Sequence, residues 1–279
     1  MGFAATILLG LVAGATILLG LPVARLRGLS VEWRGLLTAT SCGVLLFLLW
    51  DVLSAAVAPI HIALQGIRGG TPRALGTSIA YSLVLFGGLG VGLFALMTYQ
   101  RLSRPKPATM RPGPGAMAVS ELSRATLDPA RHMAFAIAVG IGLHNFAEGL
   151  AIGGSSAAGQ TKLAWALVIG FALHNGTEGF GVAGPLASAE RRPSWRLLLL
   201  LGLIAGGPTV VGTVVGYEWT NTVLSIAFLG VAAGSILFVV VQMLTMVSRT
   251  AKREFVLFGL FVGLLAGFVT DFVLTAIGA

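Results

Sequence analysis

Long uninterrupted runs of apolar residues dominate the chain, and its polar positions gather mostly between them. The hydrocarbon core of a membrane is about 30 Å thick and requires about 20 apolar residues in helical conformation. Eight runs are long enough, at 2–22, 36–58, 75–99, 131–153, 162–187, 196–217, 221–248 and 254–277. Because these runs are continuous rather than alternating, they favour helices over membrane strands. The pattern predicts an all-α, polytopic integral membrane protein with eight transmembrane helices in a compact bundle.

Composition excludes several classes of protein. Hydrophobic residues make up 56% of the 279 positions and charged residues only 10%, whereas soluble domains carry about 25% charged residues. So few charges cannot cover a soluble surface, which argues against a soluble enzyme and against disorder. The net charge of +8 does not indicate nucleic acid as a partner, because membrane proteins keep basic residues in loops. The single cysteine, Cys42, excludes an internal disulfide and a cysteine-based metal cage.

The basic residues orient the eight spans. Fifteen of the eighteen lysines and arginines fall in the loops of one side, leaving Arg68, Arg73 and Lys162 on the other. The excess marks the cytoplasmic side and places both termini outside. We therefore expect a multi-pass protein of the cell membrane (plasma or inner), with the lipid bilayer as its surroundings.

The apolar runs and the loops between them divide the chain into three parts. Residues 1–99 hold spans one to three, and 131–279 hold spans four to eight with the metal-binding spans four and five. Residues 100–130 contain five prolines and are net basic, which predicts a flexible cytoplasmic loop rather than a domain. Monomer and homodimer are both compatible with this division.

Four acids lie inside the predicted spans, where they are costly. A carboxylate near the bilayer centre costs about 2.5–3.5 kcal/mol on insertion scales. No lysine or arginine lies mid-span to neutralise the acids, and two histidines accompany them. Either the acids are protonated, or a cation from solution supplies the missing charge. The six residues are Asp51, His144, Glu148, His174, Glu178 and Asp271.

A repeated motif favours the cation. The sequence H-N-x-x-E-G occurs at 144–149 and again at 174–179, in two spans joined by a short outer connection. Residues at i and i+4 share one helix face, so the His and Glu of each copy converge while the Asn lies on the flank. Imidazole, carboxylate and amide oxygen together suit a borderline divalent ion such as Zn²⁺ or Fe²⁺. The candidate ligands are His144, Asn145, Glu148, His174, Asn175 and Glu178.

The evidence for a functional role is weaker for the remaining acids and for the motif glycines. Asp51 and Asp271 fall in the outer half of their spans, where they either line an entrance for cations or cap and snorkel near the interface. The glycine after each motif Glu is better explained by close helix packing than by chemistry. For the doubled motif itself, the alternative is a set of buried polar residues that hydrogen-bond to one another and tighten two helices.

These features resemble the ZIP (Zrt/Irt-like) family of divalent metal transporters. The resemblance rests on eight spans with both ends outside, the cytoplasmic loop between spans three and four, and the paired motifs. The stretch GVAGPL at 181–186 also resembles the family's continuation of span five. It implies a transporter rather than an enzyme, with Zn²⁺, Fe²⁺, Mn²⁺ or Cd²⁺ moved toward the cytoplasm as the cargo. It also implies metal ligation by the His, Asn and Glu of both motifs.

The chain departs from the family pattern at several positions. Ala147 and Thr177 stand where many members carry proline before the motif Glu, and Gly207 stands where span six usually has a Glu before proline. Gln242 replaces an acid that is frequent in span seven and is a weak candidate for a second site. These departures favour one full-strength site with a weaker neighbour over two equal sites.

The leading hypothesis is a transporter in which helix rocking alternately exposes a mid-membrane metal site, with Zn²⁺ as the first candidate cargo. One alternative is a membrane-embedded metalloenzyme, in which a His/Glu-held metal activates water. Against it, the sequence has no H-E-x-x-H motif and no evident general base beyond the ligands. The other alternative is a carrier of a non-metal solute whose acids relay protons.

Overall fold

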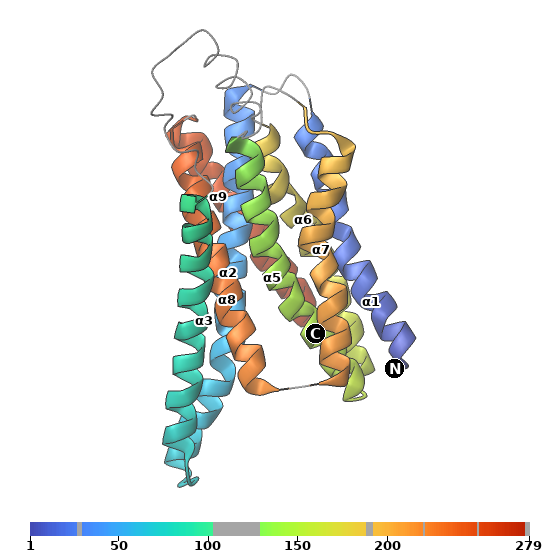
Figure 1. Ribbon diagram of the computed structural model, residues 1–279, viewed down its shortest axis with the longest axis vertical. Coiled ribbons are helices and arrows are strands. Elements are labelled where there is room, and N and C mark those ends of the chain that lie inside the picture. Colours follow the sequence, from blue (N-terminus) through green and yellow to red (C-terminus); the bar gives the residue numbers. More distant parts are fainter. Residues whose placement is uncertain (27–29, 103–128, 188–191, 220, 250, 277–279) are drawn as a thin grey trace.

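Eight long helical segments make up the fold in the computed structural model, which describes residues 1–26, 30–102, 129–187, 192–219, 221–249 and 251–276 (Figure 1). The side chains of Pro129, His174 and Leu274 lie outside this description. The elements are α1 (Phe3–Ala15) with the 3₁₀ turns η1 (Thr16–Leu19) and η2 (Leu21–Arg25), α2 (Val31–Arg68), α3 (Ala74–Leu102), α5 (Pro129–Ala157), α6 (Thr161–Ala187), α7 (Trp195–Glu218), α8 (Thr222–Val247) and α9 (Arg253–Ala276). No strand occurs in these ranges, and the predicted all-α class is confirmed.

The helices have the length and character of membrane spans. Within the described residues, seven segments are long and apolar enough to cross a membrane. The remaining long helix, α6, has 27 residues and packs beside α5, α1 and α2. α1 begins and α9 ends in the lower half of Figure 1, as an even number of crossings requires. The expectation of a polytopic bundle with eight helices is confirmed.

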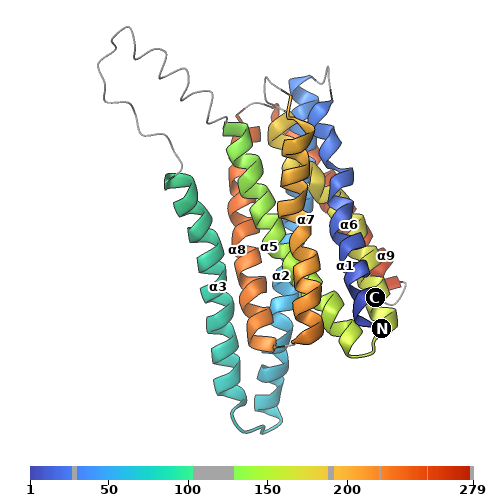
Figure 2. The ribbon, with the colours of Figure 1, turned by 45° about the vertical axis from the view of Figure 1, so that its right-hand side comes forward.

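Two spans differ from their predicted form. α2 continues to Arg68, ten residues beyond the predicted end at 58 and through Pro59. At 1.5 Å per residue its 38 residues reach about 57 Å, so the α2–α3 hairpin projects beyond the other helices (Figure 2). The helix ends only before Gly70, whose φ of 70° suits glycine. The first span changes from α to 3₁₀ geometry after Ala15.

The predicted cytoplasmic loop lies almost entirely outside the described residues. α3 ends at Leu102 and α5 begins at Pro129, so the described helices extend slightly into both ends of the predicted segment 100–130. Its flexible character stays a prediction.

Glycines let parallel helices approach to backbone contact. A Cβ added at Gly149 of α5 would lie 2.1 Å from the carbonyl oxygen of Thr209 in α7, and one at Gly153 would lie 2.2 Å from that of Thr213. Contacts of this kind also join α2 to α9 and α3 to α8. Without a hydrophobic driving force inside lipid, small residues at such contacts allow dense helix packing.

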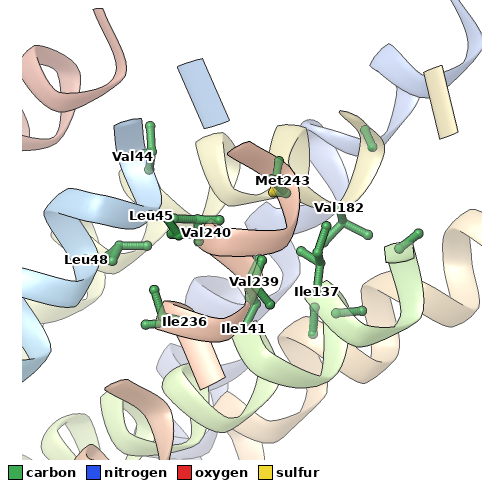
Figure 3. Packing of buried hydrophobic residues seen from close by; sticks show 14 of the residues in the cluster. Val44, Leu45, Leu48, Ile137, Ile141, Val182, Ile236, Val239, Val240 and Met243 are labelled. Atoms are coloured by element: carbon green, nitrogen blue, oxygen red, sulfur yellow. The ribbon is translucent and has the colours of Figure 1, made fainter. Parts of the chain in front are cut away.

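The bundle consists of two groups of helices that meet in an apolar core. One group contains α1, α5, α6 and α7, and in it Gly14 of α1 and Gly206 of α7 each pack against the other's carbonyl oxygen. The other group contains α2, α3, α8 and α9. Side chains from α2, α5, α6 and α8 interdigitate where the groups meet (Figure 3). The labelled residues there are Val44, Leu45, Leu48, Ile137, Ile141, Val182, Ile236, Val239, Val240 and Met243.

Candidate metal centre

α5 and α6 bring three of the predicted ligands together in the middle of the bundle. The Nε2 atom of His144 lies 3.1 Å from Oε1 of Glu148, one helical turn away, and 3.7 Å from Oε1 of Glu178 on α6. All three side chains are buried, with Glu178 only 1% exposed. The i, i+4 spacing places His144 and Glu148 on one face, as the motif predicted.

The two distances from Nε2 of His144 are close to the spacing between neighbouring donors of a tetrahedral metal ion. Zn²⁺ binds nitrogen and oxygen donors at about 2.0–2.2 Å, which puts neighbouring donors of a tetrahedral site about 3.3–3.6 Å apart. The two measured separations, 3.1 and 3.7 Å, lie on either side of that value. Among the described side chains, no group of three or more His, Cys, Asp or Glu is already in metal-holding geometry. His174 lies in α6 at the equivalent motif position, and its side chain is outside the described part of the chain.

The face of α5 that carries His144 and Glu148 is apolar in the turns that precede them. Ile137, Ile141, His144 and Glu148 follow one another at helical spacing. The two isoleucines are fully buried in the apolar core, and so is Val182, one turn beyond Glu178 on α6. Apolar side chains therefore close the cluster on the side that the basic loops assign to the cytoplasm.

A cavity adjoins the cluster. Its volume is about 210 Å³, and His144 and Glu148 line it together with Asp51 from α2. Ser225, near the first turn of α8, and Phe171 of α6 also line it. Since α8 begins at the outer side in the predicted orientation, the cavity extends from the cluster toward the outside.

The structure separates the two acids that the sequence grouped together. Asp51 shares a cavity with His144 and Glu148, whereas Asp271, on α9, is not among the described lining residues. Ser225 and Phe171 were not predicted as site residues, because a serine and a phenylalanine within apolar spans carry no distinctive sequence signal. The position of Ser225 after the N-cap residue Asn221 could have placed it near the outer mouth.

The motif asparagines contact other helices. Nδ2 of Asn145 donates to the carbonyl oxygen of Ala205 in α7, and Nδ2 of Asn175 donates to that of Ala13 in α1, both at 3.0 Å. Both side chains are fully buried. Their Oδ1 atoms have no hydrogen-bond partner among the described residues. The flanking position predicted for each Asn thus corresponds to a helix–helix contact.

The structure places Gln242, the weak second-site candidate, and Gly207, where the family's usual glutamate is absent, in different surroundings. Gln242 of α8 donates from Nε2 to Oε1 of Gln100 in α3 at 2.8 Å, so its amide nitrogen contributes to the α3–α8 contact. It is not among the described residues of the cavity. At Gly207 of α7, an added Cβ would meet nothing within 4 Å, so this position has open space and no side chain.

The fold and the cluster together define a multi-span membrane protein with acidic and imidazole groups buried between two of its helices. A sequence model described as ZIP Zinc transporter matches residues 108–275, which is more than half of the chain and includes α5 to α9. The chain belongs to the ZIP zinc transporter family, whose members move divalent metal ions across membranes and are not enzymes. No curated protein matches the chain significantly.

Proposed function

We propose that this protein carries divalent transition-metal ions into the cytoplasm through a site at the middle of the membrane. Zn²⁺ is the first candidate cargo, and Fe²⁺, Mn²⁺ and Cd²⁺ are the others. The observation that carries the proposal is that Nε2 of His144 lies 3.1 Å from a carboxylate oxygen of Glu148 and 3.7 Å from one of Glu178, with all three side chains buried. Borderline divalent ions prefer this combination of imidazole and carboxylate donors.

The electrostatic argument is that the cargo supplies the missing positive charge. Ionised carboxylates inside a membrane require a partner or a water-filled path. The described residues that line the cavity include Asp51 and Glu148 but no lysine or arginine. A divalent ion that enters from the outer side would neutralise these groups. At the cluster, the buried donors would replace its bound water molecules.

The apolar core supplies the barrier to the cytoplasm. Ile141 and Val182 lie next to the cluster on its inner side and are buried at the contact between the two helix groups. Movement of α1, α5, α6 and α7 relative to the other four helices would open this contact and expose the cluster inward. Alternating access of this kind is general among secondary transporters, and release requires that affinity for the ion be moderate.

Uptake by proteoliposomes tests the proposed function. Purified protein in lipid vesicles should move Zn²⁺ toward a metal-sensitive dye inside, and a panel of divalent ions should give the order of preference. Proton movement is followed with a pH-sensitive dye in the same vesicles. Flux of protons or a neutral solute with no metal flux would contradict the proposal and favour the proton-relaying carrier. Product formation without flux would instead favour the metalloenzyme.

Exchange of Asp51 for asparagine should weaken capture of the ion. A carboxylate in the low-dielectric wall of a cavity raises the local concentration of cations. We expect the KM for Zn²⁺ uptake to rise by about three- to tenfold in Asp51→Asn, with maximal flux within about twofold of wild type. The matched control is Asp271→Asn, an acid from the same prediction that does not line the cavity. Equal KM values in Asp51→Asn and wild type would exclude Asp51 from the entry path.

A further inference from the structure

The cavity beside the cluster has walls that a metal ion alone does not account for. Apart from Asp51, His144, Glu148 and Ser225, every described residue that lines it is apolar. A hydrated metal ion carries water on all sides, and apolar walls offer this water no hydrogen bonds. Most of the wall therefore suits a cation whose own surface is largely apolar.

The cavity has a buried inner part and an exposed rim. Val52 of α2 and Ala147 of α5 line the inner part and are buried, as is Glu148. Ala55 and Ala151, about one helical turn farther along α2 and α5, also line the cavity and are exposed. Because both helices run outward in the predicted orientation, the rim lies nearer the outside than the buried part does. A small solute would enter at this rim.

An acid and an aromatic ring come together in this cavity. Asp51 from α2 and Phe171 from α6 both line it, and no lysine or arginine is among its described residues. The face of an aromatic ring attracts a cation that lies within about 6 Å of its centre, and quaternary ammonium ligands are commonly recognised in this way. Their methyl groups also contact apolar walls without leaving a hydrogen-bond donor unpaired.

The volume of the cavity limits the size of its ligand. Pockets for drug-sized molecules measure about 300–1,000 Å³, and this cavity, at about 210 Å³, is smaller. We propose that it is a binding site for small alkylammonium cations of the size of choline, and that such a cation and an entering metal ion exclude each other. The binding is independent of the proposed function, and only the competition rests on it.

Saturation-transfer NMR of the metal-free protein tests the binding, with choline as the probe. The protein is kept in a deuterated maltoside detergent with a chelator present, so that neither lipid nor metal contributes. The methyl protons of choline should receive magnetisation from the protein. Dimethylbutanol has the same shape with carbon in place of the charged nitrogen, and it should bind at least about tenfold more weakly. Equal signals from the two molecules would overturn the proposal.

Two exchanges inside the cavity test the charge and the ring. Asp51→Asn should weaken choline binding by about fivefold or more, because charges interact strongly beside a low-dielectric wall. Phe171→Leu keeps an apolar side chain without a ring and should weaken binding by about three- to thirtyfold. The control is Asp271→Asn, whose acid is not among the described residues of the cavity; it should bind choline as wild type does. Unchanged affinity in both cavity variants would contradict the site.

A steric pair of variants tests the location without changing a polar group. Ala151→Phe places a ring at the exposed rim of the cavity and should abolish choline binding. Ala95→Phe makes the same change at an exposed position of α3, a helix with no described residue in the cavity, and should preserve binding. Equal binding in the two variants would show that choline binds elsewhere.

Zn²⁺ uptake tests the competition. Choline outside the vesicles should raise the KM for Zn²⁺ without lowering the maximal flux, and dimethylbutanol should change neither. Vesicles made with and without phosphatidylcholine distinguish a free ligand from a lipid headgroup, because only a headgroup would make the KM depend on the lipid. Normal uptake that choline does not affect would refute the competition. If the vesicles show no metal flux, the proposed function fails, whereas choline binding measured without metal still stands.

Discussion

Replacing Glu148 and Glu178 together by glutamine should abolish Zn²⁺ uptake into proteoliposomes. Loss of a residue that merely orients a metal ligand typically costs 10- to 100-fold in affinity or activity, so loss of two charged ligands should lower uptake by at least about 100-fold. Both carboxyl groups face the Nε2 atom of His144, and glutamine keeps their size while removing the charge that attracts the ion.

The same variant separates ligation from folding. Because a charged side chain at the membrane centre costs about 2.5–3.5 kcal/mol, the metal-free double variant should unfold at a temperature no lower than wild type. Wild type should gain about 2.7 kcal/mol of stability when Zn²⁺ is present at 100 times its dissociation constant, and the double variant should gain none. Glu218→Gln, at the exposed outer end of α7, is the control and should transport normally. Uptake that survives the double exchange would refute the proposed site.

A second large effect is expected from a single methyl group at Gly206. A Cβ there would lie 2.1 Å from the carbonyl oxygen of Gly14, closer than atoms can approach, so α1 and α7 must separate. Overpacking of this kind costs about 1–3 kcal/mol and sometimes more, and we expect Gly206→Ala to reach about 3 kcal/mol because the obstacle is backbone. The measurement is the thermal unfolding of the detergent-solubilised protein without metal.

The neighbouring glycine provides the matched control. A Cβ at Gly207 would meet nothing within 4 Å, and alanine has a helix propensity about 1 kcal/mol better than glycine. Gly207→Ala should therefore unfold within about 1 kcal/mol of wild type. Equal losses of stability in the two variants would show that the α1–α7 contact is not the tight one described.

Hydrophobic runs alone were sufficient to predict most of the fold. The runs at 131–153 and 196–217 became α5 and α7 with only a few residues added at their ends, because a helix is the structure that satisfies its own backbone in lipid. The extension of α2 to Arg68 was missed, because hydropathy marks the membrane-embedded part and not the length of the helix. The 3₁₀ geometry after Ala15 was also missed; this segment lies against α6, where the carbonyl of Ile17 approaches Gly179, and no local pattern contains that contact.

The site was predictable up to the face of each helix, and no further. The spacing of His144 and Glu148 implied their convergence, and the repeat implied a partner helix. The sequence pattern could not reveal that Asn145 faces α7, because the packing of the bundle decides which helix is the neighbour. The two entrance acids had similar sequence contexts, and only the three-dimensional arrangement placed Asp51, and not Asp271, among the described residues of the cavity.

Anomalous diffraction from crystals grown with Zn²⁺ tests the central claim most directly. The account predicts a zinc peak between α5 and α6, within bonding distance of Nε2 of His144 and of carboxylate oxygens of Glu148 and Glu178. Zinc found only at surface residues, with no peak beside these three side chains, would contradict it.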